Sequence, residues 1–161
     1  MREENDIWRD YDAQTMDFVE TWLDADAVKA TGLEDGFRDF YEYWAHEDGF
    51  EPGKNYWCKV VYACDTPFAV LALSLYEERL LVMEMLVAPE YRGQGRGTEL
   101  LRQLLNSHEI LGFPVRKSEA VIFPDNVASQ RAFEKAGFYC HHVHEAGTAL
   151  YYAYDSDGNR D

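Results

Sequence analysis

The chain has 161 residues, 47% hydrophobic and 15% aromatic, which is enough for one hydrophobic core and short for two. Its formal net charge of −15 argues against nucleic acid or an anionic membrane surface as a partner, because both are polyanions. No stretch approaches the roughly 20 apolar residues of a membrane span, and the acidic first six residues do not suit a signal peptide. We therefore expect a cytoplasmic protein with a single domain over residues 1–161 and a frayed tail at 155–161.

The negative charge is concentrated at the beginning of the chain. Residues 1–51 hold 16 of the 30 acidic residues but only four of the 15 basic ones. Two interpretations stay open. The segment either forms a solvated acidic surface that keeps the protein soluble, or it contributes to a pocket that selects a positively charged ligand.

The first half of the chain shows both strand and helix periodicity. A strand is predicted at 7–11, a helix at 13–23, and a second helical region over 31–46 that glycines interrupt. The β-rich runs 54–64 and 67–76 are separated only by Asp-Thr, which predicts a hairpin.

The second half alternates strands and helices. The predicted elements are strands at 79–87 and 115–123, a leucine-rich helix between them, a helix after Asn126, and a closing hairpin of 138–144 and 149–154. The strand–helix–strand unit from 80 to 123 requires one parallel strand pair inside an otherwise antiparallel sheet. The strand at 79–87 is apolar on both faces except at Glu84, which is typical of a central strand.

The most informative segment is the run from Leu86 to Leu101, where an apolar strand turns through three glycines into an amphipathic helix. The amides of a first helical turn have no partners within the helix, and glycines let a ligand approach the backbone closely. This pattern predicts a phosphate-binding loop. No Lys-Ser or Lys-Thr follows the glycines, so the form that holds Mg²⁺ in NTPases is not supported.

The spacing Arg92-x-x-Gly95-x-Gly97, preceded by Val87-x-Pro89, resembles the pyrophosphate loop of the GNAT superfamily, the N-acyltransferases that use acetyl-CoA. The resemblance implies that loop amides cradle the CoA diphosphate and that the preceding strand end pairs with the pantetheine arm. The cofactor contacts it implies here are Met85, Leu86, Val87, Arg92, Gly93, Gln94, Gly95, Arg96, Gly97 and Thr98. It also implies an α+β fold with a mostly antiparallel twisted sheet, flanked by helices, whose central parallel pair splays apart to admit the pantetheine.

A second block, Pro124 to Phe138, is similar to the Asn-x-x-Ala…Tyr-Glu-Lys-x-Gly-Phe helix of the same family. Asp125 or Asn126 suits the N-cap, and Gly137 suits the left-handed position that ends a helix. The resemblance adds Asn126, Ser129 and Phe133 to the cofactor contacts. The chain departs from the pattern twice: Phe133 replaces a Tyr that protonates the departing CoA thiolate in the family, and Ser129 replaces an Ala.

The reaction implied by the resemblance is direct attack of a primary amine on the acetyl thioester, without a covalent enzyme intermediate. An alkylamine with a pKa of about 10.4 is mostly protonated at pH 7, so a base must take its proton. Glu84 is the first candidate, because a carboxylate inside an apolar strand is costly unless used or paired, and Glu119 is the second. Structural pairing of Glu84 with a Lys, Arg or Tyr stays an equal alternative. Tyr139 is the nearest candidate in sequence for the missing acid.

The expected acceptor is a small cationic amine, such as a polyamine-like or aminoglycoside-like molecule, on charge alone. Two alternatives stay open. One is a protein or peptide N-acetyltransferase whose acidic first third binds a basic peptide. The other is a non-catalytic domain that binds acyl-CoA, because Phe133 replaces the tyrosine acid of the family. A homodimer also stays open.

No metal site is expected. Cys58, Cys64 and Cys140 are odd in number and widely spaced, which favours buried free thiols over a zinc site or a disulfide framework. The segment from His141 to His144 lacks a third ligand at a clear spacing, so its histidines are interpreted as exposed strand residues.

Overall fold

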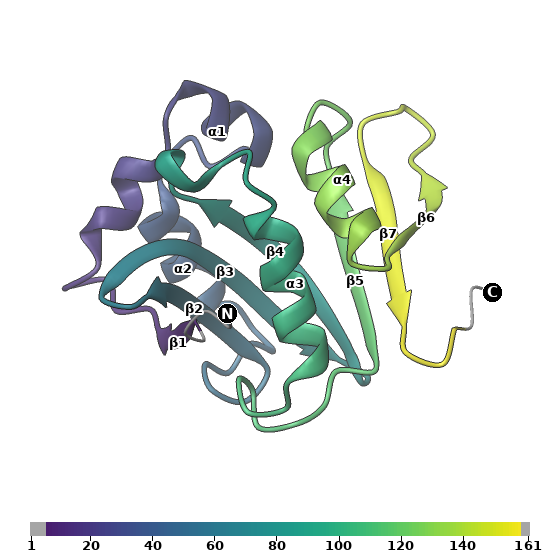
Figure 1. Cartoon of the computed structure of the whole chain (residues 1–161), viewed down its shortest axis with the longest axis horizontal. Helices are drawn as coiled ribbons and strands as arrows, with labels where there is room; N and C mark the ends of the chain where they lie inside the picture. Colours follow the sequence, from purple (N-terminus) through teal and green to yellow (C-terminus); the bar gives the residue numbers. More distant parts are fainter. Residues whose placement is uncertain (1–5, 159–161) are drawn as a thin grey trace. The chain divides into compact units, whose positions relative to one another are not determined.

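A computed structural model describes residues 6–158 (Figure 1). These residues form two compact units, one made of residues 6–74 and 84–92 and the other of residues 75–83 and 93–158. Hydrogen bonds order the seven strands β1-β2-β3-β4-β5-β7-β6. Strand β4 runs from the second unit into the first. The single domain expected over the whole chain stays a prediction.

The first unit is built on three antiparallel strands, β1 (Ile7–Asp10), β2 (Tyr56–Ala63) and β3 (Thr66–Tyr76), of which β3 enters the second unit at its end. The predicted β2–β3 hairpin is confirmed, with Val60 opposite Val70. Both of these valines are completely buried, and so is the whole run 68–73 of β3, which shows that both faces of this strand are covered.

Three short helical segments connect β1 to β2: the 3-10 helix η1 (Asp17–Trp22), α1 (Ala25–Thr31) and α2 (Phe37–Ala45). The helix predicted over 13–23 is therefore wrong in type and length, and α1 was not predicted. Helix α1 begins where the Asp24 carboxylate accepts a hydrogen bond from the Ala27 N–H at 2.9 Å, and it ends at Gly32, which is left-handed at φ 77°. The helical region predicted over 31–46 is correct only for α2.

Helix α2 is capped by a side chain from η1 rather than by its own N-cap residue. The Glu20 carboxylate accepts hydrogen bonds from the backbone N–H groups of Phe37 and Arg38, both at 2.9 Å. Gly36 occupies the N-cap at φ 94°, and a Cβ there would lie 2.5 Å from Glu20 Oε1. Glycine is favoured at this position, because residues with a side chain rarely adopt this backbone angle and a Cβ would displace the Glu20 carboxylate from the cap.

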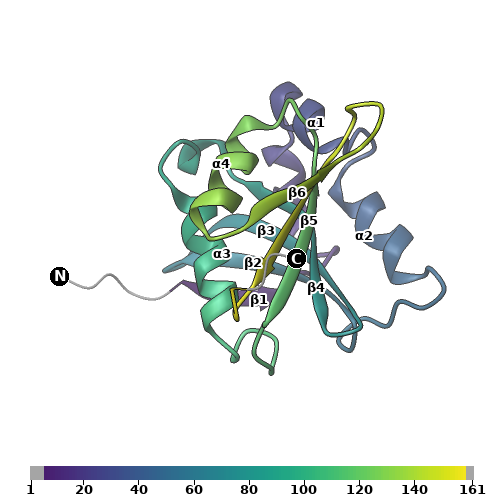
Figure 2. The same cartoon turned by 90° about the vertical axis from the view of Figure 1, so that its right-hand side faces the viewer.

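Two aromatic residues of α2, the buried Phe37 and the half-buried Tyr41, pack against aromatic rings outside the helix. The Tyr11 ring lies edge-on to Phe37 and Tyr41, with centroid distances of 5.0 and 5.1 Å, and Tyr41 stacks on Tyr56 of β2. Figure 2 shows α2 along one face of the strands of this unit. The helix is thus fixed to the sheet by edge and stacked ring contacts.

The second unit is built on the first part of β4 (Arg79–Val87) with β5 (Lys117–Ile122), β7 (Leu150–Asp155) and β6 (Tyr139–Val143). Strands β4 and β5 are parallel, and their pairing runs from Arg79 with Lys117 to Val82 with Ala120. The β5–β7 and β6–β7 pairs are antiparallel. This confirms the predicted mixed α/β class, with a mostly antiparallel sheet and one parallel pair; the splaying of that pair stays a prediction.

Two helices belong to this unit, α3 (Arg96–Asn106) and α4 (Val127–Lys135), and they contact each other. The leucines of α3 form its buried face, and Arg102 donates a hydrogen bond to the Lys135 carbonyl at the end of α4. Helix α4 lies over β5 and β7 (Figure 1), where the Tyr152 hydroxyl donates to the Glu134 carboxylate at 2.8 Å. Gly137 ends α4 at φ 106°, as predicted.

Two expectations about individual residues need correction. Cys58 is buried, but Cys64 and Cys140 are exposed, so the prediction of buried thiols holds for one cysteine of three. Asp155 is the last residue of β7 rather than the beginning of a frayed tail, and residues 159–161 lie outside the described part of the chain. Over residues 6–158, none of the helices has the length and apolarity needed to cross a membrane.

Candidate active site

The candidate site residues of the first unit lie at the end of β4. Glu84 is half-buried, and among residues 6–158 the structure gives its carboxylate no hydrogen bond or ion pair. Burial raises the pKa of Glu84 from 4.5 to about 8. A group with that pKa can accept a proton near neutral pH, which a surface carboxylate does poorly. The alternative in which a Lys, Arg or Tyr neutralises Glu84 has no support in these residues.

A short 3-10 helix, η2 (Pro89–Tyr91), follows β4 and fixes its end. The Ala88 N–H donates to the Phe68 carbonyl of β3 at 2.7 Å, and the Tyr91 ring lies 5.1 Å from the Phe68 ring. Pro89 fits the first position of this helix, where a missing N–H costs nothing. The backbone of Met85–Val87, the segment expected to pair with pantetheine, therefore leads into a rigid turn.

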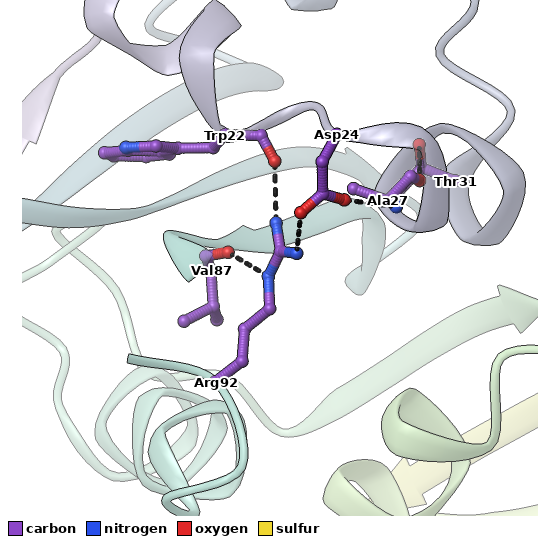
Figure 3. A network of polar contacts seen from close by, with 6 residues as sticks. All are labelled: Trp22, Asp24, Ala27, Thr31, Val87 and Arg92. Atoms are coloured by element: carbon purple, nitrogen blue, oxygen red, sulfur yellow. Dashed lines mark hydrogen bonds and ion pairs between the residues drawn. The ribbon is translucent and has the colours of Figure 1, made fainter. Parts of the chain in front are cut away.

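Arg92 ends this segment, and its guanidinium contacts three groups of the first unit (Figure 3). Nε donates to the Val87 carbonyl at 2.8 Å, Nη2 donates to the Trp22 carbonyl at 2.6 Å, and Nη1 pairs with the Asp24 carboxylate at 2.8 Å. The N–H of Ala27 and then the Arg92 guanidinium hold the pKa of Asp24 below its usual range. Arg92 was predicted as a cofactor contact; the structure places its side chain on the protein's own acceptors.

The glycine loop of the second unit opens directly into α3. Gly95 is the N-cap residue at φ 76° and supplies no capping side chain, while the first intrahelical amide bond runs from Glu99 to the Gly95 carbonyl. The amides of Gly97 and Thr98 precede that bond and have no acceptor within the helix. A Cβ on Gly93 or Gly95 would meet no atom within 4 Å, so open space lies over the loop. Amides without an acceptor in the helix, in a loop whose glycines face open space, fit a diphosphate.

The second motif forms the start of α4. Asn126 caps the helix by accepting a hydrogen bond from the Ser129 N–H at 3.1 Å. Phe133 is only 3% exposed, and its ring lies edge-on to Phe138 at 4.9 Å. The side chain that replaces the family's tyrosine is therefore part of the core of this unit.

The other candidates of the second unit lie on strands. Tyr139 is the first residue of β6 and is half-buried, with its ring 6.2 Å from His141. Glu119 of β5 pairs with Arg79 of β4 at 3.1 Å, so this second candidate base already has a charged partner. The histidines of β6 are exposed, and no group of three metal-binding side chains occurs within the described range.

Sequence reasoning missed the partners of Arg92. Asp24 precedes Ala-Asp-Ala, which is a recognisable helix start, and that signal was available in the sequence. The role of the Trp22 carbonyl had no signal, because any residue supplies a carbonyl group.

The model of the acetyltransferase (GNAT) family matches residues 11–138. A search of curated protein sequences found no match.

Solved structures share the fold at low sequence identity. An aminoglycoside acetyltransferase AAC(6′)-Ib, in complex with coenzyme A and kanamycin, is 18% identical, with 95% of this chain and 96% of that one covered and a TM-score of 0.70. A spermidine N-acetyltransferase chimera from Vibrio cholerae and hSSAT is 16% identical, with 98% and 100% covered and a TM-score of 0.71. An IAA acetyltransferase from Bacillus cereus is 15% identical, with 94% and 99% covered and a TM-score of 0.62. Because the family model spans most of the sequence, the chain belongs to the GNAT family of acetyltransferases.

Proposed function

We propose that the protein transfers an acetyl group from acetyl-CoA to the primary amine of a small cationic acceptor. The observation that carries the proposal is the loop at residues 93–98, where an uncapped helix start and left-handed glycines occur inside a match to the acetyltransferase family. Neighbours described as aminoglycoside and spermidine acetyltransferases support a cationic amine as the acceptor. A cytoplasmic location is part of this proposal.

The donor is proposed to bind with its diphosphate on the loop amides and its pantetheine along Met85–Val87. Asn126 and Ser129 are further proposed contacts, since they form the N-terminal turn of α4. Only Ala88, η2 and Arg92 lie between Val87 and Gly93, so one short turn connects the two proposed binding segments in the chain.

The proposed base is Glu84. The acceptor reaches the enzyme mostly as an ammonium ion, because an alkylamine has a pKa of about 10.4. Glu84 takes one proton, and the neutral nitrogen then attacks the thioester carbonyl. The C–N bond forms, the C–S bond breaks, CoA leaves as the thiolate with its electron pair, and the attacking nitrogen gives up its second proton to water or to the thiolate. A pKa of about 8 suits the first of these steps.

The leaving thiolate has no tyrosine at position 133 to protonate it, because Phe133 occupies that place in the core. A thiol with a pKa of about 8.5 leaves acceptably as the thiolate near neutral pH. We propose that its protonation is unassisted or comes from water or another hydroxyl, with Tyr139 as the candidate.

The buried Phe133 also favours a second function, a domain that binds acyl-CoA without turnover. The test for turnover is release of CoA thiol during incubation of acetyl-CoA with spermidine, kanamycin, matched neutral amines and a lysine-containing peptide. Release with the small cations supports the proposal, and release with the peptide alone favours a peptide acetyltransferase. Binding of acetyl-CoA without release from any acceptor favours the non-catalytic domain.

The loop itself is tested by calorimetry with acetyl-CoA on Gly95→Leu and Gly112→Leu. Gly112 is a matched control, because it also has a positive φ, 85° against 76°, and open space around it. Both variants lose about 1–2 kcal/mol of stability from the left-handed backbone. Only Gly95→Leu is expected to lower the affinity, by at least tenfold. Equal affinities in the two variants contradict a diphosphate site at this loop.

A further inference from the structure

Arg92 joins three segments of the first unit that are distant in sequence. Its guanidinium contacts the last residue of β4, the last residue of η1, and the N-cap residue of α1 (Figure 3). Asp24 has two partners in this arrangement: one carboxylate oxygen caps α1 through the Ala27 N–H, and the other pairs with Arg92. The same carboxylate therefore begins a helix and attaches it to the end of β4.

Each of the three nitrogens of the Arg92 guanidinium donates a hydrogen bond. Nε, Nη1 and Nη2 have acceptors at 2.6 to 2.8 Å, all supplied by the protein. These three bonds use three of the five N–H donors and hold the guanidinium on protein acceptors, so a diphosphate could meet only the two donors that remain. The planar fork of arginine fits such a set of acceptors, whereas a lysine ammonium has one nitrogen and cannot reach three separated oxygens.

We propose that Arg92 is a positioning residue that attaches the segment 17–31 to the end of β4 through Asp24 and Trp22, and that its side chain is not a ligand of the CoA diphosphate. The inference deepens the proposed function and rests on it for its kinetic part.

Two consequences follow for the enzyme. Segment 17–31 carries Glu20, which caps α2, so the order of both helices depends on the attachment. Met85–Val87 is the proposed pantetheine segment, and the Val87 carbonyl is held by the same guanidinium. Loss of the attachment is therefore expected to disturb recognition of the amine more than binding of the diphosphate.

The test uses Asp24→Ser, Arg92→Lys and the double variant, with Asp10→Ser as control. Serine retains the N-cap of α1 but removes the contact with Arg92. Asp10 forms an ion pair of 2.7 Å with Lys59 elsewhere in the same unit, so its loss controls for removal of an ion pair in general. A double-variant comparison measures whether the two residues act through each other.

We expect both single variants to raise the amine KM by about fivefold to tenfold, with a smaller change in kcat, and the double variant to be no worse than either. Hydrogen exchange of amides 17–31 should accelerate in all three variants and not in Asp10→Ser. Affinities for acetyl-CoA and for S-acetylpantetheine, which lacks the diphosphate, should change by the same factor.

The inference is overturned if Arg92→Lys weakens acetyl-CoA binding tenfold more than S-acetylpantetheine binding while Asp24→Ser has no effect. It is also overturned if exchange in 17–31 is unchanged in the variants. The exchange measurement needs no ligand, so it tests the attachment even if the wild-type protein fails to bind acetyl-CoA, a result that would instead refute the proposed function.

Discussion

We predict that replacing Glu84 with Gln makes the folded protein more stable at high pH and lowers its activity. Burial raises the pKa of Glu84 from 4.5 to about 8 in the folded protein. Each pKa unit corresponds to about 1.4 kcal/mol, so the charged carboxylate costs the folded state at most about 5 kcal/mol relative to the unfolded chain. Glu84 is half-buried, so about 3 kcal/mol is the expected size.

The sign of the pH effect follows from the higher pKa in the folded state. Below pH 4.5 the carboxyl group is protonated in both states, and its contribution to stability is fully present. That contribution is lost as the pH rises from 4.5 through about 8. Glu84→Gln removes the titration, so the variant should match the wild type near pH 4.5 and exceed it at pH 9.

The assay is thermal and urea unfolding of both proteins at pH 4.5 and 9, with Glu119→Gln as control because Glu119 is half-exposed and ion-paired. For a chain of this size 3 kcal/mol corresponds to about 6–12 °C in Tm. The same variant should lower kcat/KM by about 10²–10⁴, the usual contribution of a positioned base. If wild type and Glu84→Gln lose stability in parallel between the two pH values, the carboxylate is not shielded from water and its assignment as base loses its physical support.

Three further predictions concern the helix cap, the leaving group and the acceptor. Gly36→Ala should lower the free energy of unfolding, measured in urea, by about 3 kcal/mol, because the new Cβ displaces Glu20. Adding Glu20→Ala to this variant should lower it only a little further, because the cap is already lost. Losses of the two variants that add up would contradict the shared cap. Phe133→Tyr should leave turnover similar or modestly higher, and if Tyr139→Phe lowers turnover by less than a few fold, Tyr139 is not the acid, since an acid contributes about 10² or more. Cationic amines should show a higher kcat/KM than matched neutral amines, and added salt should reduce that preference because exposed charges are screened within about 8 Å; equal rates across the panel would assign the acidic first third to solubility.

The parts of the fold that depend on local pattern could be predicted from the sequence. Strand β4 was expected at 79–87 and lies at Arg79–Val87, because its run of residues is apolar except at Arg79 and Glu84 and is bounded by charged or turn residues on both sides. The cap at Asn126 and the end of α4 at Gly137 were predictable for the same reason, since each depends on the conformational preference of one residue.

The first third of the chain could not be predicted as well, because its helices depend on contacts with distant residues. Arg92 reaches Asp24 over 68 positions in the sequence, and Glu20 caps α2 over 17 or 18. Helices of six to nine residues are marginal on their own, and periodicity alone does not define their ends. That Glu84 has no partner in the described residues likewise depends on the tertiary structure. The apolar sequence around it indicated burial but could not show which groups would lie beside it.

The connection between β3 and β4 has a practical consequence for protein engineering. Its two residues, Glu77 and Glu78, both have positive φ angles, 48° and 68°. Natural two-residue hairpin turns in which both φ angles are positive favour the sequence Asn-Gly. Two glutamates in this conformation together store about 2–4 kcal/mol of backbone strain and place two negative charges side by side. Replacing the pair with Asn-Gly should release much of that strain and raise Tm by several degrees. Such a variant, altered outside every segment proposed to bind substrate, is a suitable background in which destabilising active-site substitutions still fold and can be assayed.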